Sequence, residues 1–307
     1  MESAAPSVEL HLDLDRPLDL ALTLGPQRRG RGDPTIHIEP GRAWRATRTP
    51  QGPATLCVAG PDAGGSVLRL SAWGEGADWV AANASALTGL VDDDSTYLPG
   101  HPTLRRLRRD LPGLRLARTL AVLEAVVPSV CEQLVVGLDA RRSYAALVRR
   151  LGDAAPGPLP LVLPPAPERL VAAPYWVYHQ CGIEQRRAEV LRNAARHAAA
   201  LEACAALPPA AAQQRMQALP GIGPWTAAEV AAVALGDSDA VSTGDYHLPN
   251  YVAWGLAGEA RADDNRMLEL LRPYAGHRGR VIRHLLAGGV RPPRFGPRTP
   301  RRDIRWS

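Results

Sequence analysis

Between positions 219 and 230 the sequence reads LPGIGPWTAAEV, and this stretch leaves its backbone few conformations. Gly221 and Gly223 permit a sharp turn and a close approach to a partner, because neither carries a Cβ atom. Pro224 is typical of the first turn of a helix, and Gly236 ends the apolar run that follows it. Because a second helix is expected directly before the stretch, the sequence predicts two helices joined by a tight hairpin.

The predicted hairpin consists of Leu219, Pro220, Gly221, Ile222 and Gly223. Ile222 can anchor the loop in the core, while amides at the start of the next helix point outward with the positive end of its dipole. Such a loop can hold a phosphate through backbone groups, whatever the base sequence. The alternative is an ordinary turn, since GxG alone is common. The flanking helices and the leading Leu-Pro favour phosphate binding.

A lone aspartate follows soon after, in the stretch STGDYHL at positions 242 to 248. Asp245 can cap the helix expected from Leu248, because a side-chain oxygen at this place accepts the free amides of the first turn. It can also present a carboxylate beside the hairpin, and the two roles are compatible. Its position, one helix and one loop after the hairpin, favours a functional role.

The 307 residues are enough for two domains, and the pattern changes near residue 93. The first part alternates apolar and polar residues between Gly/Pro turns, which is typical of antiparallel strands. We expect strands at Thr35–Glu39, Arg42–Thr49, Ala54–Ala59 and Val67–Trp73, and helices near Leu18–Leu24 and over Asp78–Leu90.

The second part has helical periodicity, interrupted by the Pro-rich connector PGPLPLVLPPAPE. We expect helices at Leu120–Leu134, Arg141–Leu151, Glu184–Leu201, Pro224–Leu235, Leu248–Leu256, Asp263–Tyr274 and Arg278–Ala287. The predicted fold is therefore mainly α. It has an α+β domain with an antiparallel sheet (1–93), an all-helical domain (94–290) and a basic Pro/Arg-rich tail (291–307).

Charge and composition limit the partners and the reactions that we expect for this chain. A formal charge of +5 suits a polyanionic partner, and all 36 basic residues are arginine, so no side-chain amine is available for a Schiff base. No apolar run is long enough to span a bilayer, and the N-terminal segment lacks a secretory pattern, so we expect a cytoplasmic protein. Neither a zinc site nor an iron–sulfur cluster is predicted from four widely spaced cysteines, Cys57, Cys131, Cys181 and Cys204.

LPGIGPWTA, then GDYHL, then RPYAGHRGRVIRHLL together resemble the helix–hairpin–helix DNA glycosylase superfamily, and within it the bacterial 3-methyladenine DNA glycosylase II type. The resemblance spans most of the chain and is weakest in the sheet region. It implies a monomeric enzyme of base excision repair that acts on damaged double-stranded DNA, without a cofactor or obligate protein partner. Hairpin carbonyls in this superfamily can coordinate an alkali metal ion, and nothing in this sequence decides whether one binds here.

The resemblance assigns roles to individual residues. The catalytic carboxylate falls on Asp245, and the aromatic residues that stack on the flipped base fall on Trp225 and Tyr246. The residue that wedges into the vacated base stack falls near Gln133 and Leu134. Packing under the hairpin remains the alternative for Trp225, and an ordinary core position remains the alternative for Leu134.

Phosphate contacts are expected from Thr226, Arg278 and Arg280, with Arg283, Arg28, Arg29 and Arg31 as further candidates. For any single arginine the alternative is a solvated basic surface. Each phosphate engaged should steepen the logarithmic salt dependence by roughly 0.9 on duplex DNA.

Two departures from the family pattern matter. Glu229 stands where some relatives place another aromatic residue, so we include it in the base pocket and expect a pocket that is less apolar or shaped for a different base. Members that also nick the strand carry a lysine just after the hairpin, where this chain has Pro224 and Trp225. We therefore expect a monofunctional glycosylase for alkylated purines such as 3-methyladenine. The alternatives are a glycosylase for oxidised or deaminated purines, and a non-catalytic hairpin protein that binds DNA.

Overall fold

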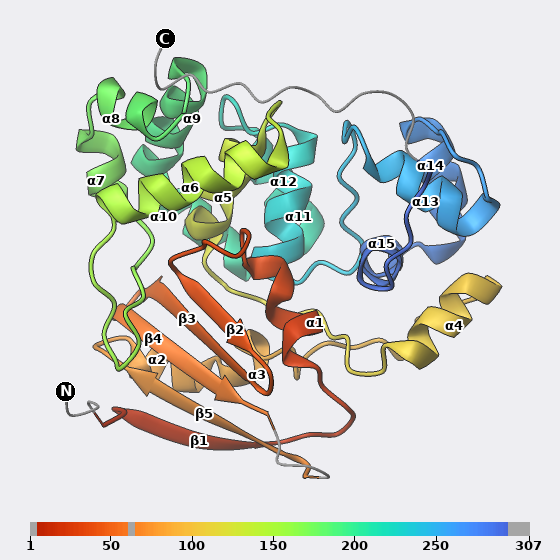
Figure 1. Cartoon of the computed structure of the whole chain (residues 1–307), viewed down its shortest axis with the longest axis horizontal. Helices are drawn as coiled ribbons and strands as arrows, with labels where there is room; N and C mark the ends of the chain where they lie inside the picture. The colour runs from red at the N-terminus through yellow and green to blue at the C-terminus, as the bar shows by residue number, and fades with distance from the viewer. Residues whose placement is uncertain (1–4, 61–64, 294–307) are drawn as a thin grey trace.

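The computed structural model describes residues 5–60 and 65–293 (Figure 1). Residues 294–307 of the expected basic tail lie outside this range. The described chain is mainly helical with one antiparallel sheet, which confirms the predicted fold class. Figure 1 shows the sheet below helices α5–α12, with α13–α15 beside them. The domain boundaries at residues 93 and 290 stay a prediction.

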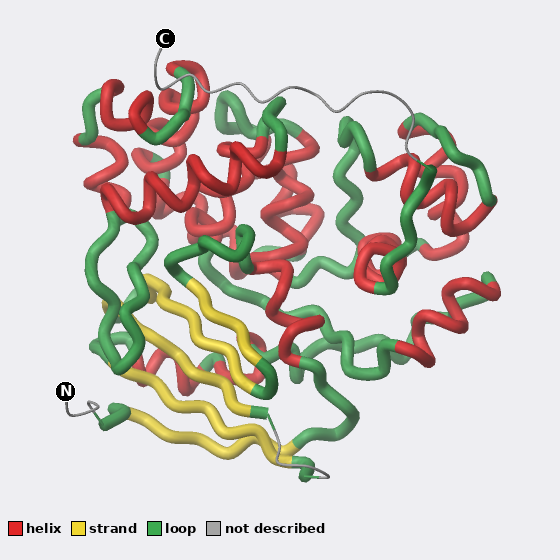
Figure 2. The backbone as a smooth tube through the Cα atoms, in the orientation of Figure 1, coloured by secondary structure: helices red, strands yellow, loops and turns green. Residues whose placement is uncertain are grey.

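The sheet has five strands in the order β1-β5-β4-β3-β2, and every neighbouring pair is antiparallel (Figure 2). The strands are β1 (Val8–Asp13), β2 (Ile36–Glu39), β3 (Arg42–Thr49), β4 (Gly52–Ala59) and β5 (Val67–Trp73). Four of them match the predicted strands closely. β1 was not predicted. It pairs with β5, which is distant along the chain, with Val8 opposite Ala72.

Each face of the sheet buries a different set of side chains, as the two-residue period of a strand requires. Leu56, Val58 and Leu70 pack against α1 (Leu20–Leu24), α2 (Ala77–Ala82) and α3 (Ala84–Leu87). On the other face Trp44 and Trp73 stack with their ring centroids 5.4 Å apart. Leu161 and Leu163 pack on this pair, so the Pro-rich connector is part of the sheet's core rather than a free linker.

The helical part contains two cores. Helices α5 to α12 surround one, and α4 with α13 to α15 surround the other. The bounds are α4 (Pro102–Asp110), α5 (Val122–Glu132), α6 (Gly137–Leu151), α7 (Pro167–Ala172), α8 (Tyr175–Gln180), α9 (Gln185–Arg196), α10 (Ala198–Glu202), α11 (Pro209–Gln217), α12 (Pro224–Val230), α13 (Leu248–Ala257), α14 (Asp264–Leu271) and α15 (Arg278–Ala287). Three of these, α4, α7 and α8, were not predicted.

Four of the predicted helices are interrupted or change type. The one expected over 263–274 is α14 followed by a 3₁₀ turn, Arg272–Tyr274. The helix expected over 78–90 is divided at Asn83, and the one expected over 184–201 is divided at His197. The helix expected over 224–235 is α12 followed by one π-helical turn, Ala231–Leu235. The last carbonyls of this helix have no partner within it, and the amides of Thr119 and Leu120 donate to those of Val233 and Ala234 at 3.1 and 3.0 Å.

Glu124 on α5 joins the helices to the sheet. Its carboxylate accepts hydrogen bonds from the guanidinium of Arg45 (2.7 Å), the hydroxyl of Thr47 (2.9 Å) and the amide of Arg48 (2.6 Å). Burial, opposed by these partners, raises the pKa of Glu124. These bonds hold the sheet beneath the bundle. Both oxygens of the Glu124 carboxylate accept hydrogen bonds, as buried polar groups require.

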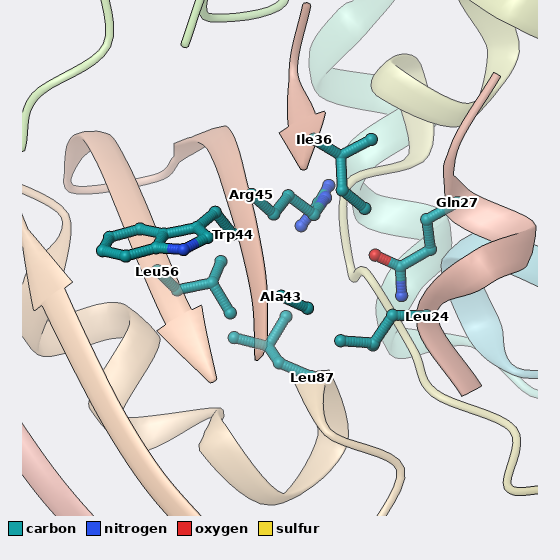
Figure 3. A pocket seen from close by; sticks show the side chains of 8 residues that line it. All are labelled: Leu24, Gln27, Ile36, Ala43, Trp44, Arg45, Leu56 and Leu87. Carbon is teal, nitrogen blue, oxygen red and sulfur yellow. The ribbon is translucent and has the colours of Figure 1, made fainter. Parts of the chain in front are cut away.

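A cavity of about 10 Å³ lies inside the sheet region, between β3, β4 and the segment from α1 to β2 (Figure 3). Its lining is mostly apolar, with Gln27 and Arg45 at one side. A space of this size holds at most one water molecule, so it is a packing gap rather than a ligand site. Among the described residues no helix has the length and apolar character needed to cross a bilayer.

Candidate functional site

The hairpin between α11 and α12 is built as its sequence predicts. The amide of Ile222 donates to the carbonyl of Leu219 at 3.0 Å, which closes a four-residue turn. Pro220 and Gly221 occupy the two central positions, and Gly221 has a φ of +90°, as a type II turn demands. A Cβ atom at Gly221 would lie 2.2 Å from Cγ2 of Val190 on α9, so this position requires glycine for two separate reasons.

The two ends of the hairpin have different surroundings. Ile222 is 3% exposed and anchors the turn in the core of α5–α12. Gly223 is exposed, and a Cβ atom added there would meet nothing within 4 Å. Its backbone is extended and leads directly into Pro224, the first residue of α12. The outer edge of the hairpin is therefore bare backbone beside a helix N-terminus, as a phosphate-binding loop requires.

Gln133 and Leu134, the predicted wedge, lie against this hairpin. The amide nitrogen of Gln133 donates to the carbonyl of Gly221 and to the hydroxyl of Thr226, both at 2.9 Å. Leu134 follows with a φ of +54° and is 99% exposed. A left-handed conformation costs a non-glycine residue roughly 1–2 kcal/mol. An exposed apolar side chain held in a strained backbone is typical of a functional position rather than a core leucine.

Thr226 is 2% exposed and its hydroxyl is already bonded to Gln133. As the structure stands, its side chain ties α12 to the wedge. While its hydroxyl is bonded to Gln133, Thr226 can contact a phosphate only through its backbone.

Asp245 links the hairpin helix to the next one. Its Oδ1 accepts the amides of His247 (2.7 Å) and Leu248 (2.8 Å), so it caps the start of α13. Its Oδ2 accepts the indole N–H of Trp225 at 3.0 Å. The carboxylate is partly buried, and its two oxygens have different partners: Oδ1 caps α13 and Oδ2 faces α12.

Glu229 lies one turn after Trp225 on α12 and accepts a hydrogen bond of 2.5 Å from the hydroxyl of Ser242. Burial raises the pKa of Glu229 above its usual value, with further raising by Glu132 and Asp245, although Ser242 and Arg29 act in the opposite direction. Glu229 therefore lies close to the candidate catalytic carboxylate, as a pocket residue would.

Tyr246 is 86% exposed, with its ring edge-on to that of His247 at a centroid distance of 4.8 Å. Tyr246 therefore lies at the surface next to Asp245 and is not enclosed in a pocket. His247 is also exposed.

The arginines of α15 are engaged within the protein. Arg280 is 1% exposed, and two of its nitrogens donate to the carboxylate of Asp92 at 2.6 and 2.9 Å. It clamps α15 to the 91–95 segment and cannot reach a phosphate without breaking that pair. Arg278 pairs with Asp239 at 2.5 Å, but its side chain is 35% exposed. Arg283 donates to the carbonyl of Leu22, and burial lowers its pKa to about 10.

The arginines of the first domain differ from one another. Arg29 donates to Glu132 at 3.3 Å and is mostly buried. Arg31 is exposed and Arg28 partly so, and within the described chain neither forms an ion pair. These two, with Arg278, are the candidates whose guanidinium groups remain accessible.

Sequence reasoning missed two residues that position the 237–247 loop. The amide of Gly244 donates to Asp264 at 2.7 Å, and Ser242 holds Glu229 as described above. Neither carried a sequence signal, because each partner is distant along the chain. Within residues 5–60 and 65–293 no group of three or more His, Cys, Asp or Glu side chains is placed to bind a metal ion, and all four cysteines are buried and free.

No family model matches the sequence, and no curated protein matches it. Solved structures do match the fold. A 3-methyladenine DNA glycosylase from Archaeoglobus fulgidus superposes with a TM-score of 0.75 at 20% identity, over 90% of this chain and 97% of that one. The apo form of an 8-oxoguanine glycosylase/lyase from Clostridium acetobutylicum superposes with a TM-score of 0.70 at 12% identity, over 93% of this chain and 97% of that one. A Schizosaccharomyces pombe 3-methyladenine DNA glycosylase in complex with abasic DNA superposes with a TM-score of 0.51 at 16% identity, over 61% of this chain and 91% of that one. At these identities the likeness shows a shared fold.

Proposed function

We propose that the protein is an intracellular, monomeric DNA glycosylase of base excision repair, which hydrolyses the N-glycosidic bond of alkylated purines such as 3-methyladenine. The observation that carries this proposal is the placement of Asp245. One partly buried carboxylate lies next to an aromatic residue at the end of a hairpin that is shaped to hold a phosphate. The shared fold with two kinds of DNA glycosylase supports the reaction class.

Binding to DNA begins at the hairpin. Its exposed amides would hold one phosphate, with the accessible arginines supplying charge at a distance. A base inside the duplex is out of reach, so the nucleotide must be extruded at a cost of a few kcal/mol. Leu134 projects from the protein directly beside the hairpin and would occupy the space that the base leaves.

Bond cleavage develops positive charge on the sugar. The carboxylate of Asp245 would stabilise this charge and orient the attacking water. Trp225 would stack on the base, which a cationic alkylated purine favours by roughly 0.5–2 kcal/mol. Because the indole now donates to Asp245, a bound nucleotide would compete with Trp225 for this carboxylate.

The absence of lysine from the sequence supports a monofunctional enzyme, since the imine that leads to strand nicking needs an amine. Incubation with abasic DNA and borohydride should trap no protein–DNA adduct. An abundant adduct, which could form through the N-terminal amine, would contradict this part of the proposal.

The test of the whole proposal is Asp245→Asn, which keeps an acceptor for the amides at the start of α13 but removes the charge. We expect base release from alkylated duplex DNA to fall on the order of 10²–10³-fold, with abasic-site binding retained. Asp263→Asn is the matched control, because Asp263 caps α14 through the amide of Arg266 at 2.9 Å and contacts no aromatic partner among the described residues. If Asp245→Asn released bases at the parental rate, Asp245 would be only a cap. If the parental protein itself released no base, the protein would be a non-catalytic DNA binder.

A further inference from the structure

Helix α12 and the 237–247 loop are joined by two hydrogen bonds, and each involves a carboxylate. Trp225 donates to Asp245 at 3.0 Å, and Ser242 donates to Glu229 at 2.5 Å. Trp225 and Glu229 are four residues apart on the helix, so their side chains project from the same face. The two carboxyl groups therefore lie along one seam between the helix and the loop.

The two groups have different partners. Asp245 accepts hydrogen bonds from three N–H donors. Glu229 accepts one hydroxyl at Oε1, and within the described chain its Oε2 has no hydrogen bond. The charged groups that face Glu229 are Arg29 from the loop before β2, Glu132 from α5 and Asp245 from the 237–247 loop.

These surroundings disfavour the charged form of Glu229. Arg29, the only cation among them, already pairs with Glu132 at 3.3 Å. Burial and the two neighbouring carboxylates raise the pKa of Glu229. A carboxyl group whose pKa is raised by burial is the kind of group that serves as a general acid in many hydrolases.

We propose that Glu229 is the catalytic acid that protonates the leaving base, so that the substrates include uncharged purine lesions, such as deaminated purines, besides cationic alkylated ones. This inference rests on the proposed function. It gives Glu229 a chemical role in addition to its hydrogen bond to the 237–247 loop.

The step balances as follows. The bond between C1′ and N9 breaks, and its electron pair goes to the purine. The proton on Oε2 of Glu229 moves to a purine ring nitrogen, so the base leaves neutral. A water oxygen bonds to C1′, and Asp245 takes the water's proton. Proton exchange with solvent then restores both carboxyl groups.

The need for this acid depends on the base. A purine alkylated on a ring nitrogen is already cationic and leaves without a further proton. An uncharged purine would otherwise leave as an anion, and a positioned general acid is typically worth 10²–10⁴-fold in such a step. Loss of Glu229 should therefore affect the two substrate classes very unequally.

The experiment compares base release from duplexes containing hypoxanthine with release from duplexes containing 7-methylguanine, for the parental protein, Glu229→Gln and Ser242→Ala. Glutamine keeps a partner for Ser242 but has no acidic proton. We expect Glu229→Gln to lose about 10²-fold or more on hypoxanthine and only a few-fold on 7-methylguanine. Ser242→Ala should change both rates by a similar factor, because it loosens the loop and leaves the acid in place.

Three results would overturn the inference: equal losses on both substrates for Glu229→Gln, no loss on either, or no hypoxanthine release by the parental protein. Release of 7-methylguanine by the parental protein separates these failures from failure of the proposed function, which predicts that release in any case. The pH profile supplies a second readout. Hypoxanthine release should fall as the pH rises through the pKa of Glu229, and Glu229→Gln should remove that fall.

Discussion

Two substitutions in the hairpin should separate its role in folding from its role in DNA binding. Gly221→Ala forces a side chain into a φ of +90° and brings its Cβ within 2.2 Å of Val190. The backbone strain costs roughly 1–2 kcal/mol, and the overpacking costs roughly 1–3 kcal/mol. We therefore expect the free energy of unfolding to fall by about 2–5 kcal/mol. At about 2–4 °C per kcal/mol, Tm should fall by about 4–20 °C.

Gly223→Ala is the matched control, two residues away in the same hairpin. The backbone there is extended, which any residue adopts, and the added Cβ meets no atom within 4 Å. We expect a loss of stability below about 1 kcal/mol. The methyl group would instead stand on the open side, where a phosphate must approach. Affinity for abasic-site duplex should fall about tenfold, which equals about 1.4 kcal/mol.

The assays are thermal unfolding and titration of a labelled abasic duplex at several salt concentrations. The double variant Gly221→Ala/Val190→Ala should recover about 1–2 kcal/mol relative to additivity, since the shortened side chain removes the clash but not the φ strain. If Gly221→Ala unfolded no earlier than Gly223→Ala, the turn described here would be wrong. If Gly223→Ala bound DNA like the parent, the hairpin would not be the phosphate site.

Two further predictions concern residues whose exposure decides the outcome. Leu134→Ala should leave Tm unchanged, because the side chain is 99% exposed, while base release falls; a stability loss of the 2–5 kcal/mol typical of a core leucine would contradict the wedge role. Arg280→Met should cost up to about 3–5 kcal/mol in chemical denaturation at pH 7, because it leaves the buried Asp92 with only the more distant Arg16 (3.4 Å) as a cation, and it should not change the salt dependence of DNA binding. Burial opposes ionisation of Asp92, but the hydrogen bonds and charge of Arg280, together with the amide of Leu116 and the charge of Arg16, outweigh it and lower the pKa. The pair therefore stabilises the fold at neutral pH and ceases to as the pH falls through that pKa. The cost of Arg280→Met should therefore shrink in acid, and an unchanged cost at low pH would rule out this pairing as its source.

The hairpin could be predicted from the sequence because its determinants are local. Pro220 and Gly221 select the turn, and Pro224 selects the start of the helix, without help from distant residues. The capping by Asp245 has the same character, since both amides it accepts lie within three residues. Its bond to Trp225 depends on the loop path and could not be derived from spacing.

Other features depend on residues far apart along the chain. Leu134 has the composition of a core position, and its exposure follows from the bond between Gln133 and a hairpin carbonyl 88 residues away. Arg280 looked like a surface arginine on a basic helix, and only the fold brings Asp92 to it. β1 alternates clearly, yet its partner strand begins at Val67. Local pattern cannot reveal such partners, because contact across the fold decides them.

The π-helical turn after α12 affects how this protein should be compared with others. Such a turn holds one residue more than an α-helical turn, and here it is the last turn before Gly236. A chain with an α-helical turn at this place would have one residue fewer between the tryptophan and the aspartate. The number of residues between Trp225 and Asp245 is therefore a poor criterion for aligning this chain with others. The criterion that the structure supplies is the meeting of indole and carboxylate in space.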